Sequence, residues 1–233
     1  ATIFALERGT DLAVTNGGTG NFYGIYDPNY LKPSASQVGF MWRTMYQIIG
    51  KANEIIAAAE DLEDTPSLRA TVSEAKCFRA QSYFLLYRTF DRIWLNIQPT
   101  TAENVNDPRD FHAASEKEVF DLIYEDLEYA ITNLDWVSDE AGRFTQAAAR
   151  HMKAKAALWL KDWDTTLEQV EEIEKSGHFD LIALNEVFNA RDLNHKEALM
   201  VQQWSKNPGG NLSNATPKGN YYAAYFIAQY RTE

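Results

Sequence analysis

Aromatic side chains beside short polar residues are the groups in this chain whose chemistry best suits a ligand. They form two sets, both in segments rich in turn-forming residues: Asn21, Tyr23, Tyr26, Asp27 and Tyr30 in the first, and Trp204, Tyr221 and Tyr222 in the second. The C–H face of a sugar ring packs well on an aromatic ring, while amide and carboxylate groups bond to its hydroxyls. We therefore predict that these residues bind a ligand. The alternative is that the rings pack their loops onto the rest of the fold.

The remaining reactive groups lack the spacing that a catalytic or metal site requires. None of the four histidines, at positions 112, 151, 178 and 195, forms a pair with metal-ligand spacing. The chain has no G-x-S-x-G, P-loop or G-x-G-x-x-G motif. Its densest carboxylate group shares one predicted helix and is typical of a solvated face: Glu168, Glu171, Glu172 and Glu174. We predict no catalytic residue, no metal and no cofactor.

Charge and composition exclude several classes of protein. The net charge of −11 over 233 residues argues against a nucleic-acid surface, because phosphate binding needs clustered lysine and arginine. No run of 18 apolar residues occurs, so a transmembrane helix is not expected. The single cysteine, Cys77, lies in an apolar helical stretch and is predicted to be a buried structural thiol.

Apolar residues at 3–4 spacing predict five helices, over 38–59, 66–90, 115–134, 145–160 and 163–175. Thr65 with Pro66 predicts one helix start, and the pair Ser115 and Glu118 predicts a capping box at another. We expect Leu167, Val170 and Ile173 to form the inner face of the last helix. The helical aromatic residues are expected in the core: Phe78, Tyr83, Phe84, Phe120 and Trp159. The fold class predicted is mostly all-α, with tetratricopeptide-like helical hairpins, long loops and little strand.

The composition changes along the chain, and it suggests three regions. Residues 1–37 read as an N-terminal loop region, and residues 38–180 read as the tetratricopeptide-like helical domain. Residues 181–233 are interpreted as the start of a second, loop-rich ligand-binding region that we expect to be incomplete. Within it, Glu197–Trp204 is predicted to be a short strand or an extended segment.

Several motifs, taken in order, resemble the SusD/RagB family. They are R-G-T-D at 8–11, K-A-N-E-I-I at 51–56, E-A-K-C-F-R-A-Q-S-Y-F-L-L-Y-R-T-F at 74–90, R-F-T-Q-A-A-A-R-H-M-K-A-K-A-A-L-W-L at 143–160 and S-G-H-F-D-L at 176–181. Glu197–Trp204 also matches the place of an E-x-x-x-x-x-Q-W-like strand of that family. Each motif is mostly helix core and weak by itself, but their common order is specific.

The resemblance implies a surface lipoprotein on the extracellular face of the outer membrane of Bacteroidetes-type bacteria. Such a protein is the lid subunit of a SusC-like TonB-dependent transporter barrel, and it captures oligosaccharides or, in some members, peptides without chemical conversion. The implied lipid anchor is not present in this chain. The matching motifs belong to the scaffold, so the resemblance assigns no binding residue. One departure concerns the segment F-G-D-x-P-L, which reads F-D-R-I-W-L at 90–95 and carries Trp94 in place of proline.

Two other functions are compatible with the helical pattern. A helical-repeat adaptor would grip peptide tails in the groove of its hairpins. A helical glycoside hydrolase would need two facing carboxyl groups, and no pair in the sequence stands in an apolar setting that would separate their pKa values.

Overall fold

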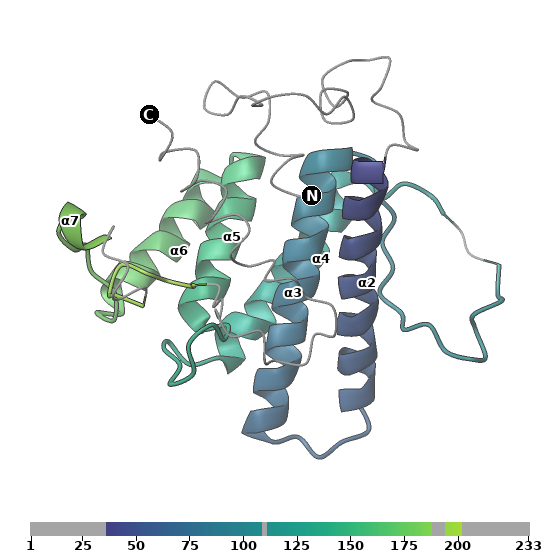
Figure 1. Cartoon of the computed structure of the whole chain (residues 1–233), viewed down its shortest axis with the longest axis horizontal. Helices are drawn as coiled ribbons and strands as arrows, with labels where there is room; N and C mark the ends of the chain where they lie inside the picture. Colours follow the sequence, from purple (N-terminus) through teal and green to yellow (C-terminus); the bar gives the residue numbers. More distant parts are fainter. Residues whose placement is uncertain (1–35, 109–110, 188–193, 202–233) are drawn as a thin grey trace, which may run out of the picture.

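The computed structural model describes residues 36–108, 111–187 and 194–201, and it shows a helical protein (Figure 1). The helices are α2 (Ser36–Ala59), α3 (Pro66–Phe90), α4 (Glu116–Asn133), α5 (Gln146–Leu160), α6 (Trp163–Lys175) and the short α7 (Leu184–Val187). These described ranges contain no β-strand. Five of the helices match the predicted ranges closely, so the all-α fold class is confirmed. The sequence pattern did not predict α7.

The helix ends form for the local reasons that the sequence indicates. Thr65 caps α3 by accepting a hydrogen bond from the backbone N–H of Leu68, and a proline occupies the first turn. Ser115 and Glu118 form the predicted capping box at the start of α4. Gly177 follows α6 with φ +69°, a backbone conformation that glycine adopts without a steric penalty. Local sequence therefore fixes where these helices begin and end.

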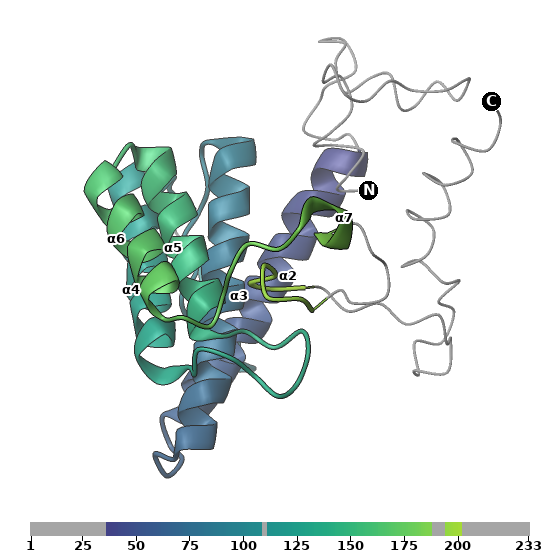
Figure 2. The same ribbon diagram turned by 90° about the vertical axis from the view of Figure 1, so that its left-hand side faces the viewer.

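The helices pack as consecutive antiparallel neighbours, with α3 between α2 and α4 (Figures 1 and 2). The next neighbour is α5, which packs on α4, and α6 packs on α5. Large side chains from the first three helices fill the core, including Ile49, Tyr83, Leu86, Ile123 and Leu127, each at most 1% exposed. The central apolar stretch of α3 thus has a neighbouring helix on both sides.

Small residues allow α5 to approach its neighbours closely. The buried face of α5 consists of alanines: Ala147, Ala148, Ala149, Ala154, Ala156 and Ala157. A methyl side chain keeps the distance between helix axes short, because little side-chain volume stands between the two backbones. The α5–α6 hairpin closes through Lys161, which has φ +61°, and Asp162, which caps α6.

The predicted inner face of α6 was wrong at two of its three residues. Ile173 is buried, but Leu167 is 59% exposed and Val170 is 41% exposed. The reason is the position of α6 at the end of the array, where it packs mainly on α5 and buries only a narrow apolar stripe. Two predicted core aromatics, Phe78 and Trp159, are likewise about half exposed.

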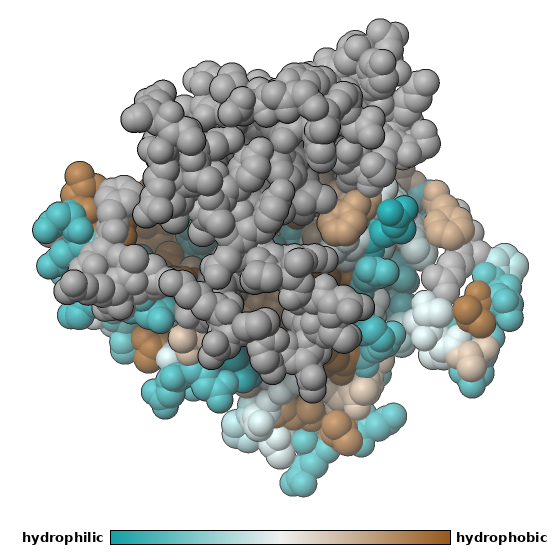
Figure 3. All heavy atoms as spheres, viewed as in Figure 1, coloured by the Kyte–Doolittle hydropathy of each residue, from teal (hydrophilic) through white to brown (hydrophobic). Residues whose placement is uncertain are grey.

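The structure tests only part of the prediction made for residues 181–233. Residues 197–201 contain no strand, and the rest of the predicted segment, including Trp204, lies outside the described residues. The boundaries of the three regions stay a prediction. Among the described helices, none combines the length and the apolar composition needed to cross a membrane. In the view of Figure 3, hydrophobic and hydrophilic side chains alternate in small patches over the coloured part of the surface.

Candidate ligand-binding site

An aromatic pocket of about 460 Å³ lies where α2 meets the segment that follows α3. Its rings come from two helical residues one turn apart, Trp42 and Tyr46, and from two residues of the α3–α4 connection, Trp94 and Phe111. Polar side chains also line it, including Arg92, Asn96 and His112. A pocket of this kind offers flat apolar faces together with hydrogen-bonding groups.

The rings contact one another in a continuous series. The centroids of Trp42 and Tyr46 are 4.8 Å apart, and the Tyr46 ring stacks on Trp94 at 6.3 Å with an angle of 25° between the planes. Phe111 follows at 4.8 Å from Trp94 and is 70% exposed. On the other side, the edge of Phe90 meets Trp42 at 5.0 Å. These contacts orient each ring by its neighbour, which keeps the aromatic surface rigid.

Two tyrosine hydroxyls hold the backbone beneath Trp94 in place. The Tyr46 hydroxyl donates to the Trp94 carbonyl at 2.7 Å and accepts from the N–H of the same residue at 3.0 Å. The Tyr83 hydroxyl makes the equivalent pair with the carbonyl and N–H of Asn96, both at 2.8 Å. The segment is therefore extended, with alternate residues turned toward the helices, and its backbone groups are satisfied without a sheet.

A buried polar network supports the same segment from below. Asn53 donates to the Asn96 carbonyl at 2.7 Å and accepts from Arg79 at 2.8 Å. Arg79 binds both carboxylate oxygens of Asp126, each at 2.7 Å, and Lys76 adds a third contact to Asp126 at 2.8 Å. The network joins α2, α3 and α4 to the pocket. Because each charge is paired in a nearly dry setting, removal of one partner would leave a costly buried charge.

Burial shifts the pKa values of the groups that anchor the pocket. It raises the pKa of Tyr46, although the hydrogen bond with the Trp94 backbone partly opposes this shift. Burial likewise raises the pKa of Tyr83 well above its usual value of about 10. Both phenols therefore remain protonated at neutral pH and can keep donating to the carbonyl groups above them. Burial alone would lower the pKa of Arg79, but the contacts with Asp126 outweigh it and raise the pKa overall.

The pocket can bind a ring-shaped ligand by stacking on the faces of that ring and by hydrogen bonding to groups at its edge. The pocket lining contains no carboxylate side chain, so it offers no pair of acids across a cleft. The described residues also contain no cluster of three histidine, cysteine or acidic side chains that could hold a metal ion. Stacking combined with edge hydrogen bonds is the chemistry that this pocket supports.

The residues predicted from sequence as ligand-binding lie outside the described ranges. They are Asn21, Tyr23, Tyr26, Asp27, Tyr30, Trp204, Tyr221 and Tyr222. The aromatic pocket was not predicted, because Trp42 and Tyr46 lie inside a predicted helix and Phe111 stands in a polar loop. One signal did point to it: Trp94 occupies a place where the resembling family has proline, and a large ring in a turn needs a packing partner.

Comparison with known proteins identifies the family. Residues 7–158 match a family described as SusD-like, "Starch-binding associating with outer membrane". The chain belongs to this SusD-like family. A "SusD-like protein" of Bacteroides ovatus is 26% identical over 212 residues, which cover 80% of this chain and 38% of that protein. The chain thus spans well under half the length of this curated relative.

Solved structures agree with the SusD-like fold. A SusD-like protein from Bacteroides fragilis superposes with a TM-score of 0.67 at 24% identity, covering 77% of this chain and 36% of that one. A SusD-like carbohydrate-binding protein from the same species gives a TM-score of 0.63 at 21% identity, covering 71% and 32%. At these identities the likeness establishes the fold of the helical array. The ligand of this SusD-like chain has to be inferred from the chain's own residues.

Proposed function

We propose that this SusD-like chain is part of a non-catalytic, surface glycan-binding subunit of a nutrient-uptake complex. In this proposal it captures an oligosaccharide, or a peptide, and delivers it to a SusC-like TonB-dependent transporter barrel. The subunit would lie on the extracellular face of the outer membrane and be held there by a lipid anchor. The observation that carries the proposal is the match of residues 7–158 to a starch-binding family that associates with the outer membrane.

The aromatic pocket supports the sugar-binding part of the proposal. Its four rings, Trp42, Tyr46, Trp94 and Phe111, present apolar faces on a rigid base, which lowers the entropy that binding would otherwise cost. Arg92 and Asn96 add hydrogen-bond donors of the kind that recognise hydroxyl groups.

Isothermal titration with a panel of oligosaccharides tests sugar binding at this pocket. The panel contains α-1,4-glucans, β-1,3-glucans and xylogluco-oligosaccharides, together with short peptides. We expect at least one glycan to bind and Trp94→Ala to weaken its association constant about tenfold, because the stacking face is lost. Trp163→Ala is the matched control, since Trp163 is 57% exposed on α6, away from the pocket. Equal affinity of the two variants would exclude the pocket as a glycan site.

The two predicted loop sets are proposed as further ligand contacts. Replacing Tyr23, Tyr26 and Tyr30 together, or Trp204, Tyr221 and Tyr222 together, by alanine should weaken glycan binding in the same titration. If only these variants lose affinity while Trp94→Ala keeps it, the glycan site belongs to the loops. A complete lack of binding to every glycan and peptide would contradict the proposed function itself.

Association with a transporter is tested separately. The complete subunit, co-expressed with a SusC-like barrel protein from the same organism, should co-purify with that barrel from outer membranes in mild detergent. Recovery of the subunit alone, with the barrel present in the same membranes, would contradict the lid role without affecting the sugar-binding proposal.

A further inference from the structure

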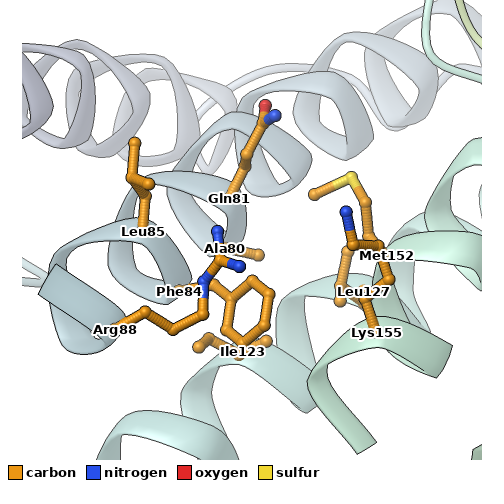
Figure 4. A pocket seen from close by; sticks show the side chains of 9 residues that line it. All are labelled: Ala80, Gln81, Phe84, Leu85, Arg88, Ile123, Leu127, Met152 and Lys155. Atoms are coloured by element: carbon orange, nitrogen blue, oxygen red, sulfur yellow. The ribbon is translucent and has the colours of Figure 1, made fainter. Parts of the chain in front are cut away.

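A second pocket lies between α3, α4 and α5, and it differs in chemistry from the aromatic pocket (Figure 4). Its floor is apolar and comes from Ala80, Phe84, Ile123 and Leu127, with Met152 at the side. The volume is about 110 Å³, compared with about 460 Å³ for the aromatic pocket. This space suits one side chain or one small organic molecule, and it is too small for an oligosaccharide.

Two cations stand at the rim of this pocket. Figure 4 shows Arg88 reaching it from α3 and Lys155 reaching it from α5. Within the part of the chain that the structure describes, neither side chain forms an ion pair. By contrast, nearby Lys153 pairs with Glu128 at 2.6 Å. In a chain of net charge −11, two unpaired cations at one small pocket form a local site of positive potential.

The guanidinium group of Arg88 is oriented by its neighbour. It lies over the ring of Phe84, with its central carbon 4.4 Å from the ring centroid. Stacking of this kind occupies the face of the guanidinium group and leaves its N–H donors free at the edge, where they match a carboxylate. Phe84 is held in turn by edge-to-face contacts with Phe120 and Trp159. Because these contacts already order the Arg88 side chain, binding of an anion costs less side-chain entropy.

We propose that this pocket binds an aliphatic carboxylate, with the carboxylate between Arg88 and Lys155 and the carbon stem on the apolar floor. Two sources have this chemistry: a free short-chain acid and the glutamate side chain of a peptide. The site is separate from the proposed glycan pocket, because the two share no lining residue. It does not depend on the proposed function.

NMR of the intact chain with ¹³C-methyl-labelled methionine tests the proposal, since Met152 lines the pocket. The probes are butyrate and acetyl-glutamate-amide, compared with their neutral counterparts butyramide and acetyl-glutamine-amide at constant ionic strength. We expect a saturable shift of the Met152 methyl signal with at least one acid and none with the amides. Tighter binding of acetyl-glutamate-amide identifies a peptide side chain as the source, and tighter binding of butyrate identifies a free acid.

Charge-removing variants complete the test. Arg88→Gln and Lys155→Gln should each weaken carboxylate binding about tenfold, because a charge-assisted hydrogen bond is lost. Lys117→Gln, on the exposed side of α4 where Lys117 pairs with Asp121, is the matched control and should leave binding unchanged. Equal shifts with acids and amides, or full affinity in both pocket variants, would overturn the proposal.

A second readout follows from His151, one turn before Lys155 on α5. Partial burial lowers the pKa of His151, and the positive charge of Lys155 lowers it further. A carboxylate bound at Lys155 would offset this charge, so saturation with the acid should raise the pKa of His151 in an NMR titration. An unchanged pKa at saturation would place the acid elsewhere and contradict the proposed site.

Discussion

Two parts of the helical array are built on different principles. The inner unit, α2, α3 and α4, buries large side chains such as Tyr83 and Leu127 together with the charged network around Asp126. The outer hairpin, α5 and α6, buries mainly alanines, and only Gln169 and Ile173 are buried on α6. Apolar residues recur at helical spacing in both parts, yet the burial that they produce differs.

The difference teaches that neighbours, and not pattern alone, decide how much an apolar residue stabilises the fold. In the inner unit, α3 and α4 each pack against a helix on either side, whereas α6 at the end of the array packs mainly on α5. The aromatic pocket is anchored to the inner unit, through Tyr46, Tyr83 and Asn53. We therefore expect changes in the inner unit to affect both stability and glycan binding, and changes in the outer hairpin to affect neither strongly.

The largest effect is expected for Asp126→Ala. The variant leaves Lys76 and Arg79 buried without a counter-ion, so the free energy of unfolding should fall by about 3–5 kcal/mol in urea titrations. Asp121→Ala is the control on the same helix, because the Asp121 side chain is 63% exposed and its partner Lys117 is 82% exposed. It should cost less than about 1 kcal/mol. A comparable cost of the two variants would refute the importance of the network.

A matched leucine pair tests the role of neighbours directly. Leu127 is 1% exposed in the inner unit, and Leu167 is 59% exposed on α6. Leu127→Ala should lower the free energy of unfolding by about 2–5 kcal/mol, because it leaves a cavity. Leu167→Ala should stay within about 0.5 kcal/mol of the parent. If Leu167→Ala costs as much as Leu127→Ala, α6 has a packing partner in solution beyond the described residues.

Alkaline pH should weaken the inner unit through Tyr83. Burial raises its pKa in the folded state, so the unfolded chain loses this proton first as pH rises. The stabilising effect is complete below the unfolded pKa of about 10 and decreases above it, by at most about 1.4 kcal/mol per pH unit. Urea titrations at pH 8 to 11 should give a shallower slope for Tyr83→Phe than for the parent chain. Identical slopes would show that Tyr83 titrates normally.

The smallest effect is expected at the start of α6. Asp162 accepts a hydrogen bond from the backbone N–H of Thr165 at 3.1 Å, and the hydrogen bonds from Thr165 lower the pKa of Asp162. Asp162→Ala should cost about 1 kcal/mol, while Asp162→Asn, which keeps the acceptor, should cost less. The contribution of the carboxylate is present above its unfolded pKa and is lost as pH falls through the folded pKa. If Asp162→Ala lowers the free energy of unfolding equally at pH 7 and pH 2.5, the result contradicts the role of the Asp162 carboxylate.

The parts of the fold that depend on local rules could be predicted from the sequence. The caps at Thr65 and Ser115 follow from residues within one turn, and so does the left-handed glycine at 177. The exposure of Leu167 could not be predicted, because the 3–4 spacing is the same whether one neighbouring helix or two are present. The aromatic pocket was missed for a related reason. Trp42 and Phe111 are far apart in the sequence and meet only through the packing of a loop on a helix.

The sequence by itself determined the five long helices, their ends, the family and the order of the hairpins, since each depends on short-range spacing or on motifs in order. Only the tertiary structure decided which rings share a pocket and which charges are buried. It also decided that Arg88 and Lys155 stand at one small cavity. The physical reason is that burial and electrostatic pairing arise between segments, and their energies depend on distances that no stretch of sequence contains.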